Sequence, residues 1–96
     1  MVEIEFPSSL KSVAASAFYN CKKLQTVVFE DEGLLESIGA SAFNSTAIKN
    51  ITLPNIAKVS NNLFRGCKKL ESVTFTGYLT AIGESAFYGC SSLKSI

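Results

Sequence analysis

The stretch Ser16-Ala17-Phe18-Tyr19-Asn20-Cys21 decides the fold of this 96-residue chain, because its pattern recurs three more times. The recurrences are Ser41–Thr46, Asn62–Cys67 and Ser85–Cys90. We call these four segments the Phe units; their phenylalanines stand 25, 21 and 23 residues apart. A period in the twenties is typical of a solenoid, in which each repeat forms one turn of a stacked coil.

A segment with the pattern of a half-buried strand precedes each Phe unit. In residues 1–6, Val2, Ile4 and Phe6 alternate with Glu3 and Glu5, which is the period of two expected for a strand with one buried face. Equivalent segments, which share the pattern L-x-x-V/I-x-F/L, are residues 24–29, 48–53 and 70–75, and residues 93–96 begin another. Stacked about 4.8 Å apart, these segments would form a parallel sheet along one side of the coil.

The chain then turns a corner and enters a second leg. Pro7 and Pro54 stand just past two of the predicted strands, where no ladder donor is required. The second leg repeats apolar residues at a fixed offset of three, at Leu10 and Val13, Leu35 and Ile38, Ile56 and Val59, and Leu79 and Ile82. Each repeat thus has two apolar legs before its Phe unit.

The Phe units predict short helical or 3-10 turns on the side opposite the strands. They begin with Ser16, Ser41, Asn62 and Ser85, which are favourable N-cap residues. Asn20, Ser45, Gly66 and Gly89 stand near their ends, where a left-handed backbone conformation is common. We therefore expect one α/β solenoid domain over residues 1–96, with about four turns whose apolar faces are buried only by stacking.

Composition excludes several classes of function. The net charge of +1 gives no general attraction to nucleic acid, and Lys22-Lys23 and Lys68-Lys69 make only a short, interrupted basic stripe. No apolar run approaches the ~20 residues that span a bilayer, and the N-terminus lacks the pattern of a signal peptide. We therefore predict neither nucleic-acid binding nor membrane insertion. The acidic group Glu3, Glu5, Glu30, Asp31 and Glu32 is interpreted as a solvated face, with contact to a partner as the alternative.

The chain offers little for catalysis or for a cofactor. It has no histidine, which removes the commonest general base and the commonest zinc ligand. Cys21, Cys67 and Cys90 occupy one slot of the repeat, and Cys21 would lie roughly 10 Å from Cys67, too far for a shared metal. We predict packing roles for these thiols, no metal or cofactor, and no enzymatic activity.

The full repeat, L-x-x-(I/V)-x-(L/F)-P…L-x-x-I-G-x-x-A-F-x-x-C-x-x-L, resembles that of the BspA-like leucine-rich repeat family. The last copy carries the pattern best, at Leu79, Ile82, Gly83, Ala86, Phe87, Cys90, Leu93 and Ile96. Ser60 and Leu63 replace Gly and Ala in the third copy, and Thr46 replaces Cys in the second. The resemblance implies a right-handed solenoid cut from a longer array, in a secreted or cell-surface protein associated with adhesion.

The strand side is the predicted binding surface, because its outward side chains are free of packing constraints. The candidate binding residues are Thr26, Val28, Asn50, Thr52, Ser72 and Thr74, and the expected partner is a protein, such as a host or matrix protein, or a glycan. The outer side chains of the Phe units, Tyr19, Asn44, Arg65 and Tyr88, share no common chemistry. The alternative function is a structural spacer, or a fragment that associates with itself through uncapped ends.

Overall fold

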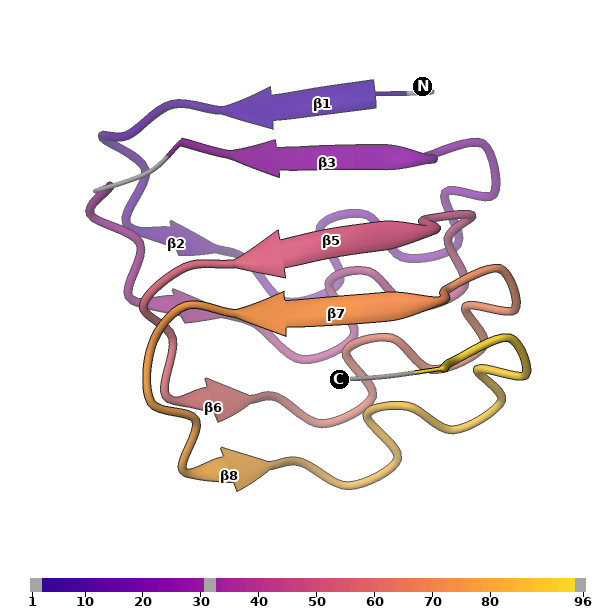
Figure 1. Ribbon diagram of the computed structural model, residues 1–96. Coiled ribbons are helices and arrows are strands. Elements are labelled where there is room, and N and C mark those ends of the chain that lie inside the picture. Colours follow the sequence, from indigo (N-terminus) through magenta and orange to yellow (C-terminus); the bar gives the residue numbers. More distant parts are fainter. Residues whose placement is uncertain (1–2, 31–32, 95–96) are drawn as a thin grey trace.

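Long and short parallel strands alternate along the chain and wind into a β-solenoid (Figure 1). The computed structural model describes residues 3–30 and 33–94, so the predictions for Val2, Asp31, Glu32 and Ile96 lie outside the described residues. The long strands are β1 (Glu3–Phe6), β3 (Thr26–Phe29), β5 (Asn50–Leu53) and β7 (Ser72–Phe75). The coil makes about three turns, so the expected count of four is not confirmed.

The long strands bury alternate residues, as the sequence predicts. Ile4 and Phe6 in β1 are half-buried, whereas Glu3 and Glu5 are exposed. In β5 the same alternation is complete, with Ile51 and Leu53 buried and Asn50 and Thr52 exposed. Apolar side chains therefore point into the coil, and the outward side chains form a surface that we call the strand face.

The second leg of each repeat contains a two-residue strand, which the sequence did not predict. These strands are β2 (Ser12–Val13), β4 (Ser37–Ile38), β6 (Lys58–Val59) and β8 (Ala81–Ile82). β2 pairs with β4, and β6 pairs with β8, both in parallel. Three of their apolar residues are buried, namely Val13, Ile38 and Val59. The apolar residues spaced three apart in the second leg therefore mark inward positions on a second side of the coil.

The Phe units form consecutive turns, and the predicted helical or 3-10 turns are absent from the described residues. Ser16, Ser41, Asn62 and Ser85 have φ angles of 57–60°. An N-cap residue has an extended backbone, so the capping interpretation is wrong. The residues predicted to be left-handed near the end of each unit do have positive φ angles, namely Asn20, Ser45, Gly66 and Gly89.

In the first three Phe units, alternate N–H groups bond to different partners, a pattern that is incompatible with a helix. The Tyr19 N–H donates to the Ser16 carbonyl three residues back, at 3.2 Å. The Phe18 N–H instead donates to the Ala42 carbonyl of the next unit, at 2.9 Å. An α-helix directs successive N–H groups to carbonyls four residues back in the same segment. A segment that gives every second N–H to the neighbouring repeat cannot satisfy this requirement.

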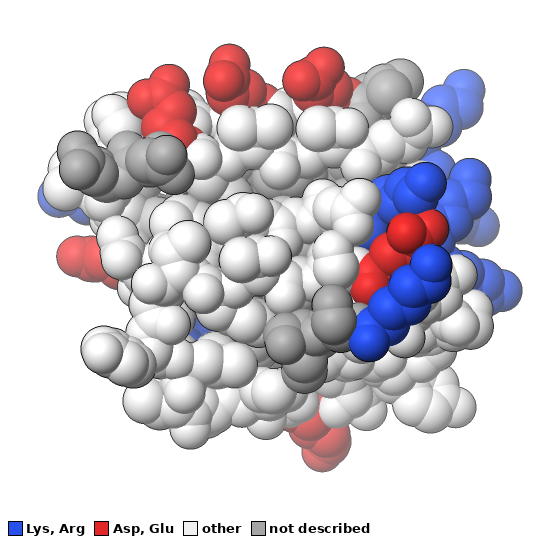
Figure 2. Space-filling view, in the orientation of Figure 1, with Lys and Arg blue, Asp and Glu red and all other residues white. Residues whose placement is uncertain are grey.

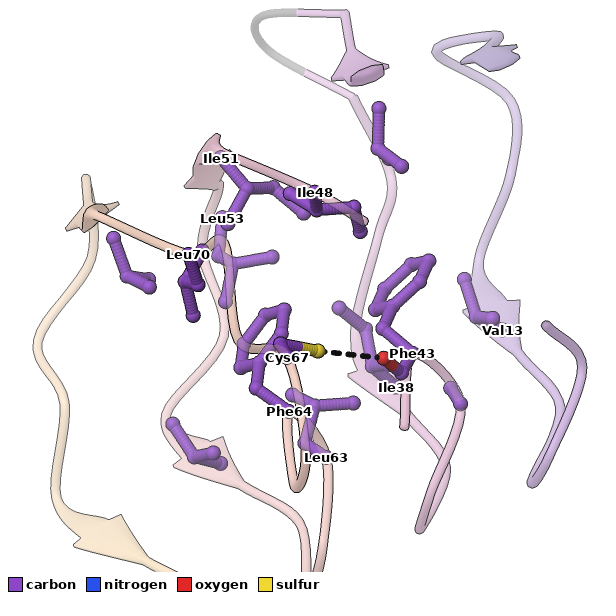
Figure 3. Close-up of a cluster of buried hydrophobic side chains, with 14 of the residues drawn as sticks. Val13, Ile38, Phe43, Ile48, Ile51, Leu53, Leu63, Phe64, Cys67 and Leu70 are labelled. Carbon is purple, nitrogen blue, oxygen red and sulfur yellow. Dashed lines mark hydrogen bonds between the residues drawn. The ribbon is translucent and has the colours of Figure 1, made fainter. Parts of the chain in front are cut away.

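A column of stacked phenylalanine rings runs through the core. The ring centroids of Phe18 and Phe43 lie 5.7 Å apart, those of Phe43 and Phe64 lie 5.9 Å apart, and those of Phe64 and Phe87 lie 5.7 Å apart. The two middle rings are fully buried, and the two outer ones are half-buried. Figure 3 shows Phe43 and Phe64 among inward side chains from both legs of the repeat.

The strand side is divided into two sheets, contrary to the single parallel sheet predicted. β1 pairs with β3, and β5 pairs with β7, but no ladder joins β3 to β5. The short strands divide at the same place, between β4 and β6. We call this division the seam. The Phe units bridge it, because the Phe43 N–H donates to the Leu63 carbonyl at 3.2 Å and the Ser45 N–H to the Arg65 carbonyl at 2.8 Å.

Two features of the sequence explain the seam. Ile48 stands five positions after Phe43, whereas Leu24 stands six positions after Phe18, so the connection into β5 is one residue shorter than the connection into β3. At the other end of β5, Pro54 has no N–H to donate across the gap. The corresponding donor after β7, the Thr76 N–H, does bond to the Leu53 carbonyl, at 3.3 Å.

The seam also explains why Ser60 replaces glycine in the third repeat. A Cβ atom on Gly39 would lie 2.4 Å from the Ala15 nitrogen, and one on Gly83 would lie 2.6 Å from the Asn61 nitrogen. Both glycines therefore allow the close approach of the preceding repeat. Ser60 lies at the seam, where no strand ladder draws the two repeats together.

Candidate functional site

The six side chains predicted to bind a partner all line one hollow on the strand face. They come from β3, β5 and β7, and Glu5 of β1 and Glu30 complete one end of the hollow. The hollow is shallow and open, with a volume of about 660 Å³. It lies over the seam, since its lining includes Val27 and Ile51 of the two strands that are not paired.

The register of the strands sets the order of side chains along this hollow. Thr52 lies beside Thr74 in the β5–β7 pair, and Asn50 lies beside Ser72. The Ser72 hydroxyl donates to the Asn50 Oδ1 at 2.7 Å, which fixes both side chains. The β1–β3 pair places Val28 beside Glu5, so the uncharged row ends at a carboxylate.

Charged side chains border the strand face without covering its centre. Figure 2 shows acidic side chains along the upper edge and basic side chains gathered at the right-hand edge, with uncharged surface between them. The centre offers hydroxyl, amide and aliphatic groups. Val28 is 39% exposed, which leaves an apolar contact among the polar ones. Such a surface can form hydrogen bonds and small apolar contacts with a partner, without a fixed charge at its centre.

The outer side of the Phe units differs from its prediction at Asn44. We expected this residue to point outward, but it is buried. Its Oδ1 accepts a hydrogen bond from the Ser45 hydroxyl at 2.8 Å, so Asn44 bonds to the neighbouring side chain of its own unit. The neighbouring Arg65 and Tyr88 do lie outside, and the guanidinium carbon of Arg65 lies 4.9 Å from the centre of the Tyr88 ring. The only feature of the sequence that relates the two residues of this cation–π pair is that they occupy equivalent positions in successive Phe units.

The three cysteines are free thiols, and two of them make hydrogen bonds that we did not predict. The Cys67 Sγ donates to the Phe43 carbonyl at 3.0 Å, as the dashed line in Figure 3 marks. The Cys90 Sγ donates in the same way to the Phe64 carbonyl, also at 3.0 Å. The cysteine slot thus joins the third repeat to Phe43 and the fourth repeat to Phe64.

Burial favours the protonated form of the Cys67 and Cys90 thiols. It raises the pKa of Cys67, and the hydrogen bond with Thr46 lowers it by less. Burial also raises the pKa of Cys90 to about 11, with a smaller contribution from the neighbouring Cys67. Thiolates are the reactive form of cysteine, so neither residue is poised for nucleophilic or redox chemistry near neutral pH.

No cluster of three or more metal-binding side chains occurs in residues 3–30 and 33–94. In the same part of the chain, no helix has the length and apolar character needed to cross a membrane.

The repeat, the stacked rings and the parallel strands agree with one known family. The model of the BspA type leucine-rich repeat region matches residues 1–96 in six copies. This chain belongs to the BspA-type leucine-rich repeat family. The predicted resemblance is confirmed, and the parallel solenoid is its structural basis.

Solved structures similar to this BspA-type chain are all much longer. A leucine-rich repeat protein from Bacteroides ovatus is 31% identical, with a TM-score of 0.86 over 98% of this chain and 24% of its own length. Pneumococcal vaccine antigen PcpA is 27% identical, with a TM-score of 0.84 over 97% of this chain and 26% of its own. A leucine-rich cell surface protein from Faecalibacterium prausnitzii, 20% identical with a TM-score of 0.52, is similar in fold. A comparison with functionally curated proteins found no match.

Proposed function

We propose that this BspA-type module binds an extended segment of another protein on its strand face. The observation that carries the proposal is the hollow over the seam, in which all six candidate side chains meet. Parallel strands present their outward residues in rows, and an extended segment can follow such a row from strand to strand. A protein partner is favoured over a glycan because Val28 adds an exposed apolar contact to the row.

A location on a cell surface or outside the cell accompanies this function. Its support is the family together with the Faecalibacterium prausnitzii neighbour, which is described as a cell surface protein. The module would contribute adhesion to a protein of the surroundings and no catalysis. The chain spans about a quarter of the length of the first two similar structures, so other modules of such proteins can carry further contacts.

The proposal is tested by mapping the bound surface at residue resolution. The isotope-labelled chain is titrated with individually purified matrix proteins while amide chemical shifts are recorded. We expect the largest shifts at Thr26, Thr52 and Thr74, with Tyr19 and Tyr88 unchanged. Shifts confined to the Phe units, or no shift with any matrix protein, would count against the proposal. Competition by soluble neutral glycans would show that the partner is a sugar.

A second candidate function, self-association, is favoured by the two open faces of the described stack. Ile82 is 47% exposed in β8, although Val13, Ile38 and Val59 at equivalent positions are buried. At the opposite face Ala17 is exposed, although Ala42 at the equivalent position is fully buried. A second copy stacked head to tail would cover both residues.

Sedimentation velocity at several concentrations separates the two candidates. Self-stacking predicts association that Ile82→Glu or Ala17→Glu abolishes, because a charge would be buried in the contact. Leu34→Glu is the control, since Leu34 is 56% exposed in a corner loop away from either open face. A chain that stays monomeric at every concentration would exclude self-association and leave strand-face binding as the remaining candidate.

A further inference from the structure

The short second repeat leaves a hollow between two pairs of lysines on the edge where the long strands begin. Lys22-Lys23 and Lys68-Lys69 occupy equivalent turns, closed by the Leu24 N–H to the Cys21 carbonyl at 3.0 Å and the Leu70 N–H to the Cys67 carbonyl at 3.2 Å. The repeat between them has one residue at this turn where the others have two lysines. That residue is Ala47, which is buried. What the sequence shows as an interrupted stripe is therefore a recess with basic walls.

This recess has a volume of about 440 Å³ and is lined by six polar or basic residues together with Ala47 and Gly66. Lys22 stands on one wall, Lys68 and Lys69 on the other, and Ser45, Thr46 and Ala47 form the floor between them. Two strand steps of ~4.8 Å place the lysine pairs roughly 10 Å apart. One anionic group in the recess can thus approach amines from both walls, and neighbouring groups along the same ligand can reach the outer lysines.

The lysines of the recess have no competing partner in the described chain. The ion pairs of residues 3–30 and 33–94 join Glu71 to Lys49 at 3.7 Å and to Lys94 at 4.0 Å. Glu71 and Lys49 lie at the edge where the long strands begin, since they immediately precede β7 and β5. Glu71 therefore neutralises part of the edge but leaves Lys22, Lys68 and Lys69 available to an external anion.

We infer that this recess binds an acidic polysaccharide through its sulfate or carboxylate groups. The lining favours this class over single-stranded nucleic acid, because it contains no aromatic side chain on which bases could stack. The exposed side-chain amide of Asn20 suits the hydroxyls of a sugar. The recess lies on a different surface from the strand-face hollow, so it is a second site that does not depend on the proposed protein partner.

Heparin, immobilised at low ionic strength, is the probe for this site, with neutral dextran and a single-stranded DNA of equal charge as comparisons. We expect the chain to bind heparin with an affinity that falls steeply with salt, because ion release drives contacts between lysines and a polyanion. Lys22→Gln/Lys68→Gln should weaken binding at least tenfold. Lys11→Gln/Lys58→Gln is the matched control, since it removes the same charge from exposed positions in the second leg, and it should change affinity less than twofold.

The outcomes separate the recess from general charge. Equal losses in the two double variants, or no binding to heparin, would overturn the inference. Tighter binding to the DNA than to heparin would also overturn it, in favour of nucleic acid. Thr52→Glu on the strand face should leave heparin binding unchanged, so failure of the strand-face proposal and failure of this inference are distinguishable.

Discussion

The Cys67 thiol donates a hydrogen bond to the Phe43 carbonyl oxygen at 3.0 Å, and both residues are fully buried. The bond joins two repeats from inside the core, where a carbonyl without a partner would be costly. Cys67 therefore acts as a small apolar residue and as a hydrogen-bond donor at once.

Replacing the Cys67 side chain by a methyl group should lower the free energy of unfolding by more than the change in size alone suggests. We expect Cys67→Ala to lower the free energy of unfolding by about 1–3 kcal/mol, because the Phe43 carbonyl loses its thiol donor in the core. Cys21→Ala is the matched control: Cys21 is only half-buried and makes no such bond in the described chain, so its effect should be below about 1 kcal/mol. Urea melts of both variants give the comparison, and equal losses would show that the hydrogen bond adds nothing.

The stacked phenylalanines should differ in importance according to their place in the column. Truncating a buried Phe to Ala costs about 3–5 kcal/mol, out of a total of about 5–15 kcal/mol for a small domain. Phe43→Ala and Phe64→Ala should therefore unfold the chain or nearly so, because both rings are stacked on two sides. Phe87→Ala should be milder, since its ring is half-buried at one end of the described column. If denaturant melts gave all three variants a free energy of unfolding within about 0.5 kcal/mol of the parent, the stacked core would be refuted.

Glycine should be required where the repeats approach closely and dispensable at the seam. Gly39→Ala should destabilise by about 1–3 kcal/mol, because its Cβ would overlap the backbone of Ala15 and force the repeats apart. Ser60→Ala at the equivalent position should be neutral or stabilising, since the Ser60 Oγ is buried without a hydrogen-bond partner in the described residues. Thermal melts check both, and a harmless Gly39→Ala would contradict the close approach.

Stability should fall at alkaline pH partly through Cys90. Burial raises the pKa of this thiol to about 11, from an ordinary value of 9.0 that we expect in the unfolded chain. Between these two values the folded state keeps a proton that the unfolded state loses. The stability that this thiol contributes is therefore fully present below pH 9 and is lost as the pH rises toward 11. Urea midpoints measured from pH 8 to 10.5 should fall less steeply for Cys90→Ser than for the parent. Parallel curves would show that Cys90 is not coupled to folding.

The repeat and its inward residues were predictable because they are local patterns that recur. The period of the Phe units and the alternation in β1 and β5 each predicted what the structure shows. The helical interpretation of the Phe units failed because Ser16 and its equivalents, although favourable N-cap residues, have left-handed backbones, and the first three units donate alternate N–H groups to the next repeat. A rule based on neighbours in the sequence does not include those bonds.

The seam and the basic recess were harder to predict because each depends on how one repeat compares with the next. The missing residue before Ile48 is visible in the sequence, but its effect on pairing appears only when the strands are stacked. The six strand-face residues were found because the pleat fixes which side chains point outward, and their meeting in one hollow follows from the register. Their role in binding stays a prediction.

Binding of a protein partner on the strand face is tested by substitutions on two surfaces of the module. Thr52→Glu and Thr74→Glu change exposed strand residues and should alter stability by less than about 0.5 kcal/mol. Arg65→Ser and Tyr88→Ser change the outer side of the Phe units, where both residues are also exposed. Binding of each variant to a matrix protein that the parent chain binds is then measured by surface plasmon resonance. We expect either strand substitution to abolish binding, while both outer substitutions leave the affinity unchanged. Loss of binding in the outer variants, with binding retained in the strand variants, would contradict the strand-face proposal.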